Sequence, residues 1–218
     1  MTLRARILGA AAGGGLPQWN CGCENCTLAR AGEILSQTQS SLAVSGNGTD
    51  WAVLNASPDI RQQLATTREL HPTGLRDMPL RSVLVTNGDI DHVAGLLTLR
   101  EMQPFTLFAT VGIHDVLRAN PVFDALNAEV VLRRSIVLGE PFDLAPDLEA
   151  TLFSVPGKVP LYMEGEEVET GLLGDQTVGV HLRAGESDCF YIPGCARLSE
   201  DLAERLRGAA LVLFDGTL

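Results

Sequence analysis

Residues 86–96 read Thr-Asn-Gly-Asp-Ile-Asp-His-Val-Ala-Gly-Leu, directly after the apolar run Ser-Val-Leu-Val. This stretch places Asp89, Asp91 and His92 at the end of a predicted strand. Two carboxylates and an imidazole this close repel when ionised and are costly to desolvate, so a divalent cation is the simplest way to hold them together. The alternative is a solvated, aspartate-rich turn that caps the following helix. Local chemistry leaves both interpretations open.

The segments around this loop alternate between predicted strands and helices. Upstream we expect strands at 4–9, 41–44 and 51–55, then a helix that Ser57 caps, with Pro58 in its first position. A strand at 82–86 precedes the loop, and a helix from about residue 93 follows it and stops before 104. Further strands are expected at 106–109, 129–132, 136–138, 148–155, 178–183, 189–192 and 210–214, and further helices at 111–119, 122–126 and 200–207. The pattern favours an α/β sandwich with outer helices over a doubly wound parallel sheet.

Length and charge restrict the class of protein. A chain of 218 residues with 45% hydrophobic content can bury one core, so we expect a single domain over 1–218. The 16 basic and 27 acidic residues give a net charge of −11, and no basic cluster offers a footprint for nucleic acid. No apolar run reaches the roughly 18 to 20 residues of a membrane helix, which excludes membrane insertion by a helix. We expect a soluble, cytoplasmic protein.

Cysteines provide a second candidate metal site. Cys21, Cys23 and Cys26 follow a Cys-x-Cys-x2-Cys spacing that lets three sulfurs converge on one ion, as in a structural zinc site. A closed site needs a fourth ligand, and Cys189, Cys195, His71 or a neighbouring subunit are all open candidates. The alternative is three reduced thiols without metal.

Asn55 closes the predicted strand at 51–55, where a buried amide needs hydrogen-bond partners. It either braces the 89–92 loop or initiates an ordinary turn before Ser57 and Pro58.

The chain closely resembles the coenzyme PQQ synthesis protein B family, a branch of the metallo-β-lactamase superfamily. The resemblance implies an αββα sandwich with its metal site at the sheet edges. The matching segments include the cysteine cluster and the aspartate-histidine loop, and they lie at 13–26, 37–41, 54–61, 86–100, 154–161, 191–197 and 213–217.

In the wider superfamily the loop reads His-x-His-x-Asp-His. Here Asn87 and Asp89 occupy the first two histidine positions, while Asp91 and His92 keep the last two. Fewer imidazoles and more carboxylates favour a redox-capable ion such as Fe(II) over paired zinc. That substitution also argues against two-zinc ester or phosphodiester hydrolysis.

The resemblance implies a non-haem iron-dependent oxygenase that hydroxylates the tyrosine-derived ring of a Glu–Tyr cross-linked PQQ precursor. Asp91 and His92 would bind Fe(II), and Asp89 would bind metal or act as a base. The alternative is a carrier that helps PQQ or its precursor reach the periplasm, with a pocket lined by Arg100, Lys158 and Arg197.

Members of the family continue past the Asp-Gly-Thr at 215–217, and that tail carries further histidine ligands. The resemblance therefore implies a domain incomplete at its C-terminus, with weak metal binding and impaired activity. We also expect exposed apolar surface and association, for example into a homodimer.

Overall fold

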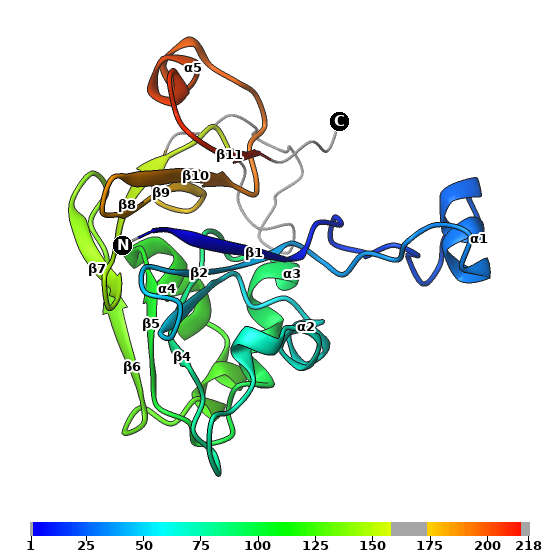
Figure 1. Cartoon of the computed structure of the whole chain (residues 1–218), viewed down its shortest axis with the longest axis horizontal. Helices are drawn as coiled ribbons and strands as arrows, with labels where there is room; N and C mark the ends of the chain where they lie inside the picture. Colours follow the sequence, from blue (N-terminus) through cyan, green and yellow to red (C-terminus); the bar gives the residue numbers. More distant parts are fainter. Residues whose placement is uncertain (1, 158–173, 215–218) are drawn as a thin grey trace.

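The computed structural model describes residues 2–157 and 174–214. Two sheets lie face to face, with helices on both outer sides (Figure 1). The first sheet has the order β1 (Arg4–Gly9), β2 (Ser41–Ser45), β3 (Trp51–Leu54), β4 (Leu80–Leu84), β5 (Phe105–Ala109) and β6 (Val131–Ser135). The second has the order β11 (Val212–Phe214), β10 (Ser187–Ile192), β9 (Val178–Ala184), β8 (Leu148–Ser154) and β7 (Pro141–Ala145).

The first sheet changes direction at β3. Strands β1 to β3 pair antiparallel, whereas β3 to β6 pair parallel. The carboxyl ends of β3, β4 and β5 therefore lie along the same edge of the sheet. Loops that leave these strands meet there, and the loop after β4 is the one that carries the candidate metal ligands.

Alternation along β3 shows how the layers are stabilised. Trp51 and Val53 belong to the core beneath the helices, whereas Ala52 and Leu54 belong to the core between the two sheets. All four side chains are buried, because a strand directs successive side chains to opposite faces and both faces of this sheet are covered.

Helices complete the outer layers. The first sheet is covered by α2 (Ile60–Thr66), α3 (Ile90–Val93) and α4 (Val111–Arg118), with the 3-10 turns η1 (Arg68–Leu70), η2 (Ala94–Leu97) and η3 (Pro121–Ala125). The outer face of the second sheet packs against α5 (Glu200–Leu206), where Leu202 meets Phe153 and Phe190. The predicted αββα sandwich is confirmed.

Several predicted boundaries were wrong. Residues 136–138 form no strand, and β7 at Pro141–Ala145 was not expected. The strand before the ligand loop ends at Leu84 rather than 86, and the helix after it begins at Ile90 rather than 93. The segment expected as a helix at 122–126 is the 3-10 turn η3. Short apolar runs do not distinguish these alternatives, because burial decides them.

The capping role predicted for Ser57 was also wrong. Helix α2 begins at Ile60, and the Ser57 hydroxyl instead donates to Gln63 Oε1 at 3.0 Å. The carboxylate of Asp59 accepts from the backbone N–H of Gln39 at 3.0 Å. The Asp59 carboxylate therefore ties the start of α2 to the chain that precedes β2, whereas the Ser57 hydroxyl bonds to a side chain of α2 itself.

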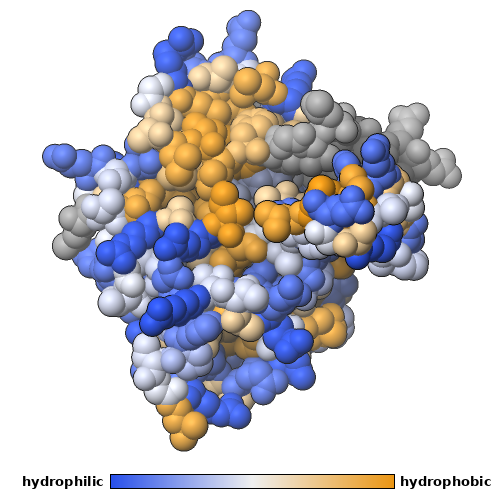
Figure 2. All heavy atoms as spheres, turned by 45° about the vertical axis from the view of Figure 1, so that its right-hand side comes forward, coloured by the Kyte–Doolittle hydropathy of each residue, from blue (hydrophilic) through white to orange (hydrophobic). Residues whose placement is uncertain are grey.

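Helix α1 (Glu24–Ala31) was not predicted, and it projects from the sandwich on an extended arm (Figure 1). Within the described part of the chain, no helix has the length and apolarity needed to cross a membrane. Figure 2 shows apolar surface gathered on the part of the molecule that carries the second sheet and α5. Large exposed apolar side chains in this region include Leu198, Leu211 and Phe214.

Candidate metal centre

The loop after β4 is held at its start by a buried asparagine. Asn55 lies at the end of β3 in the left-handed backbone region, with φ 65°. Its Oδ1 accepts from both the backbone N–H and the hydroxyl of Thr86, each at 3.0 Å. Asn55 therefore braces Thr86, the residue where the loop leaves its strand, while a bracing contact with residues 89–92 themselves stays a prediction.

Helix α3 is fixed against the same strand end by backbone contacts. The N–H of Ala56 donates to the carbonyl of His92 at 2.9 Å, and the N–H of Gly95 donates to the carbonyl of Ala56 at 2.8 Å. A Cβ at Gly95 would lie 2.1 Å from the carbonyl oxygen of Ser57. Only glycine permits this approach, and the approach fixes His92 in place.

The second sheet closes over the loop from the other side. Asn87 forms an antiparallel bridge with Thr177, and the N–H of Val178 donates to the carbonyl of Thr86 at 3.0 Å. Asn87 and His92 are 5% and 3% exposed. The loop is thus held by backbone from both sheets.

Two of the three candidate ligands, Asp91 and His92, lie next to each other, and Asn87 contacts the same imidazole. His92 Nε2 is 3.8 Å from Asp91 Oδ2, and His92 Nδ1 is 2.7 Å from Asn87 Oδ1. Asp89 is the N-cap residue of α3, but its side chain accepts no capping hydrogen bond. The capping alternative therefore explains why Asp89 stands at the start of α3, but it does not explain the role of the Asp89 carboxylate.

A cavity of about 1160 Å³ lies in front of these side chains, where the ends of the two sheets meet. Asp89, Asp91 and His92 contribute to its wall. The first sheet and its loops add 9–13 and 39–42, and the second adds 191–196 and 212–214. Among the described lining residues there is no arginine or lysine. The charged groups of this described wall are carboxylates, which a bound cation would compensate.

Gly13 is a further residue of the cavity wall. A Cβ there would lie 3.4 Å from the Asp91 carboxylate. The glycine run at 13–15 was the available signal, since glycine permits backbone to approach a site closely.

The three cysteines form a separate cluster on the arm. The sulfurs of Cys21, Cys23 and Cys26 all lie within 4.8 Å of one another. This is the one group of three or more potential His, Cys, Asp or Glu ligands that is so compact within residues 2–157 and 174–214. Asp89, Asp91 and His92 are less tightly grouped, and their shared ion stays a prediction.

The fourth-ligand candidates lie outside this cluster. Cys189 is buried between the sheets, where burial raises its pKa to about 11. Cys195 lines the cavity, and the His71 imidazole contacts the carbonyl of Ala65 at 2.9 Å. No described residue of this chain joins the three sulfurs as a fourth compact ligand, so the choice between zinc and free thiols stays open.

Hydrogen bonds give Cys23 and Cys26 different thiol pKa values. The backbone N–H of Cys26 and the Cys21 thiol lower the pKa of Cys23. At Cys26 the N–H of Gln18, 3.4 Å from the sulfur, acts to lower the pKa, but burial and the neighbouring thiols outweigh it and the pKa is raised. Cys23 therefore ionises more readily than Cys26, and a cysteine must be ionised to bind a metal.

Fold and loop together define the class of protein. The chain has the architecture of a metallo-β-lactamase-type protein: two facing sheets, outer helices, and a loop with aspartates and a histidine at the cavity. The family model for the beta-lactamase superfamily domain matches residues 50–218. Coenzyme PQQ synthesis protein B of Ruegeria pomeroyi is 63% identical over 97% of this chain and 72% of its own length. The chain belongs to the coenzyme PQQ synthesis protein B family, which supports a role in PQQ biosynthesis.

Solved structures agree with this assignment. The crystal structure of zinc-bound PqqB from Methylobacterium extorquens is 56% identical, with a TM-score of 0.95 over 98% of this chain and 72% of that one. A diphosphatase of the PhnP family, at 20% identity, has a TM-score of 0.67 over 97% of this chain and 72% of its own. The second likeness shows the fold alone.

Proposed function

We propose that this chain binds a redox-capable metal ion at Asp91 and His92, with Asp89 beside it, and serves to hydroxylate the tyrosine-derived ring of a PQQ precursor. One observation carries the proposal. The cavity wall combines two carboxylates and an imidazole with no described cation, on a loop that both sheets hold in place.

The donor set fits such an ion. Carboxylate oxygen and imidazole nitrogen are the ligands that Fe(II) takes in oxygenases with two histidines and one carboxylate. Sulfur ligands suit zinc, so we assign the cysteine cluster to a structural zinc. The zinc bound by the Methylobacterium extorquens relative supports metal binding in the family without choosing between these two places.

Each side chain then has a separate task. Asp91 and His92 would hold Fe(II), which supplies activation of dioxygen when bound. Asp89 lines the cavity one helical turn from His92 and would take up the proton that the ring carbon releases and return it to the new hydroxyl oxygen. One oxygen atom enters the C–H bond, and the other leaves as water with two electrons from an external reductant and two protons.

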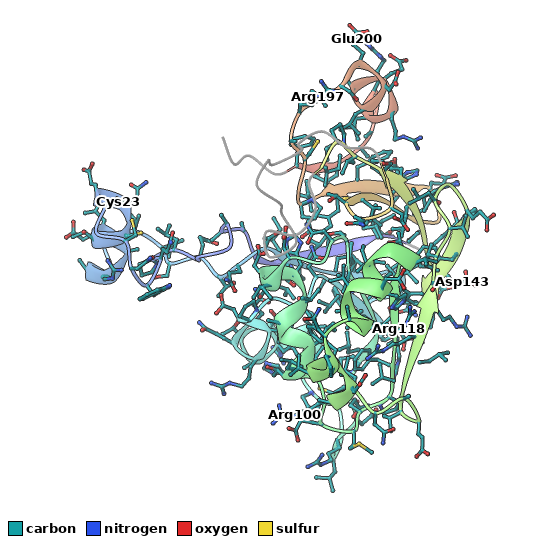
Figure 3. The ribbon with its side chains drawn as sticks, turned by 180° about the vertical axis from the view of Figure 1, so that it is seen from behind. Cys23, Arg100, Arg118, Asp143, Arg197 and Glu200 are labelled. Carbon is teal, nitrogen blue, oxygen red and sulfur yellow. The ribbon has the colours of Figure 1, made fainter. Side chains whose placement is uncertain are left out.

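The carrier alternative is less well supported. The precursor is derived from glutamate and tyrosine and carries carboxylates, so a carrier pocket needs cations. Arg100 and Arg197 lie at opposite ends of the molecule, and neither lines the cavity (Figure 3). Lys158 lies outside the described residues. The three side chains expected to line a carrier pocket are not brought together as a group.

The test is a single-turnover reaction. Protein loaded with Fe(II) without oxygen is mixed with the cross-linked precursor, a reductant and ¹⁸O₂, and the product is analysed by mass spectrometry. We expect one labelled oxygen atom in the ring, and none with the His92→Gln variant. Product without label, or equal product from the variant, would contradict the proposal. Tight precursor binding without turnover that survives His92→Gln would favour the carrier.

A further inference from the structure

We propose that Asn87 is a positioning residue that fixes the proton of the His92 imidazole on Nδ1, so that Nε2 is the nitrogen presented to the metal. The inference rests on the proposed function for the role of the metal. The placement of the proton follows from contacts within the chain and can be tested without any ion.

The first step fixes the orientation of the Asn87 amide. One end of this side chain lies 3.0 Å from the backbone N–H of Asp89. A backbone N–H can only donate, so the amide atom that faces it must be the oxygen. The Asp89 backbone thus decides which end of the amide is Oδ1.

The second step fixes the tautomer of His92. The same Oδ1 lies 2.7 Å from His92 Nδ1. A carbonyl oxygen can only accept, so Nδ1 must carry the hydrogen. In the neutral ring the lone pair is then on Nε2, and Nε2 is 3.8 Å from Asp91 Oδ2. The Nε2 lone pair is thus on the edge of the ring that lies near the Asp91 carboxylate.

The third step concerns how firmly Asn87 itself is held. Its backbone bridges to Thr177 in the second sheet, and its side chain is buried. Gly194 faces the other end of the amide, since a Cβ there would lie 3.4 Å from Asn87 Nδ2. The amide therefore sits in a fixed position between two sheets, and a fixed acceptor is what orients an imidazole ligand.

The position of Asn87 in the sequence gives this arrangement a wider meaning. By the resemblance described in the sequence analysis, Asn87 occupies the position of the first histidine of the superfamily loop. The exchange replaces a ligand with a hydrogen-bond acceptor for the remaining histidine. Part of what the site loses in ligand number is thus recovered as orientation of His92.

Two variants and one control test the proposal. Asn87→Ala removes the acceptor, whereas Asn87→Asp keeps an oxygen that can accept from both Nδ1–H and the Asp89 N–H. Asn47→Ala is the matched control. Like Asn87 Oδ1, Asn47 Oδ1 accepts two hydrogen bonds, here from the backbone N–H groups of Thr49 and Asp50, and it lies in a hairpin outside the cavity.

The readout is the ¹⁵N spectrum of histidine-labelled, metal-free protein at a pH where imidazole is neutral. We expect His92 to carry its proton on Nδ1 in the wild type, in Asn87→Asp and in Asn47→Ala, and to populate both tautomers in Asn87→Ala. Anaerobic Fe(II) titration, followed by broadening of the His92 signal, should show about 10–100-fold weaker binding for Asn87→Ala.

A wild-type proton on Nε2 would overturn the inference, whether or not the variants fold. An unchanged tautomer in a folded Asn87→Ala would also overturn it. If the proton lies on Nδ1 but Fe(II) leaves the His92 signal unaffected, the proposed function fails and the placement of the proton by Asn87 stands.

Discussion

The two candidate metal sites of this chain are constructed in opposite ways. The cysteine cluster uses three residues of one segment, 21–26, at the far end of the arm from the sandwich (Figure 3). The aspartate-histidine loop is equally short in sequence, but Asn55 of the first sheet and Thr177 of the second hold it in place. The comparison indicates that the arm site can assemble without the core, whereas the loop site depends on the closed sandwich.

Removing ligands from the loop should have the largest effect. We expect Asp91→Asn combined with His92→Gln to weaken Fe(II) binding at the cavity by more than the roughly 10–100-fold that loss of a supporting hydrogen bond costs. Metal bound to the cysteines should be unchanged. Anaerobic titration and elemental analysis measure both, and loss of both metals together would break the comparison.

Adding one methyl group beneath the loop tests its dependence on packing. Gly95→Ala places a Cβ against the backbone carbonyls of Ser57 and Ala56, so we expect a loss of about 3 kcal/mol of stability, together with weaker metal binding at the loop. Chemical denaturation measures the loss. Gly22→Ala is the control on the arm, because a Cβ there meets nothing within 4 Å. Equal effects of the two substitutions would contradict the account.

A substitution in the arm should have a smaller effect on the domain. Cys23→Ser removes the thiol whose pKa is lowered, and we expect it to abolish stoichiometric zinc binding at the cluster. The free energy of unfolding of the sandwich should change by less than about 0.5 kcal/mol, as for surface substitutions. Zinc analysis and denaturation test this prediction together. A cooperative loss of the whole fold would show that the arm supports the core.

The smallest expected effect is on the pH dependence of stability. Burial lowers the pKa of His114, although its bond to the Arg134 carbonyl opposes this. The unfolded chain therefore binds a proton more readily, so stability is retained above the ordinary imidazole pKa and lost as pH falls below it. His114→Gln should flatten the fall between neutral and mildly acidic pH. An unchanged pH profile in denaturation experiments would contradict this assignment.

The sequence predicted what depends on local chemistry. The order of predicted strands and helices favoured an α/β sandwich, and the family resemblance implied its αββα form. Cysteine spacing predicted the convergence of three sulfurs, because that property needs only neighbours in the chain. The short helix α3 was misplaced because the backbone contacts of Ala56 and Gly95 decide it. The hydrogen bond from His92 to Asn87 was not foreseen either, since an asparagine in a loop carries no signal of the ring it will face.

Metal analysis of three proteins tests the central claim most directly. The three proteins are the wild type, a cysteine variant (Cys21→Ser/Cys23→Ser/Cys26→Ser) and a loop variant (Asp91→Asn/His92→Gln). Each is loaded with Fe(II) and Zn(II) without oxygen, freed of excess metal and analysed for both elements. We predict iron and zinc in the wild type, iron alone in the cysteine variant and zinc alone in the loop variant. Iron that persists in the loop variant, or that disappears with the cysteines, would contradict the account.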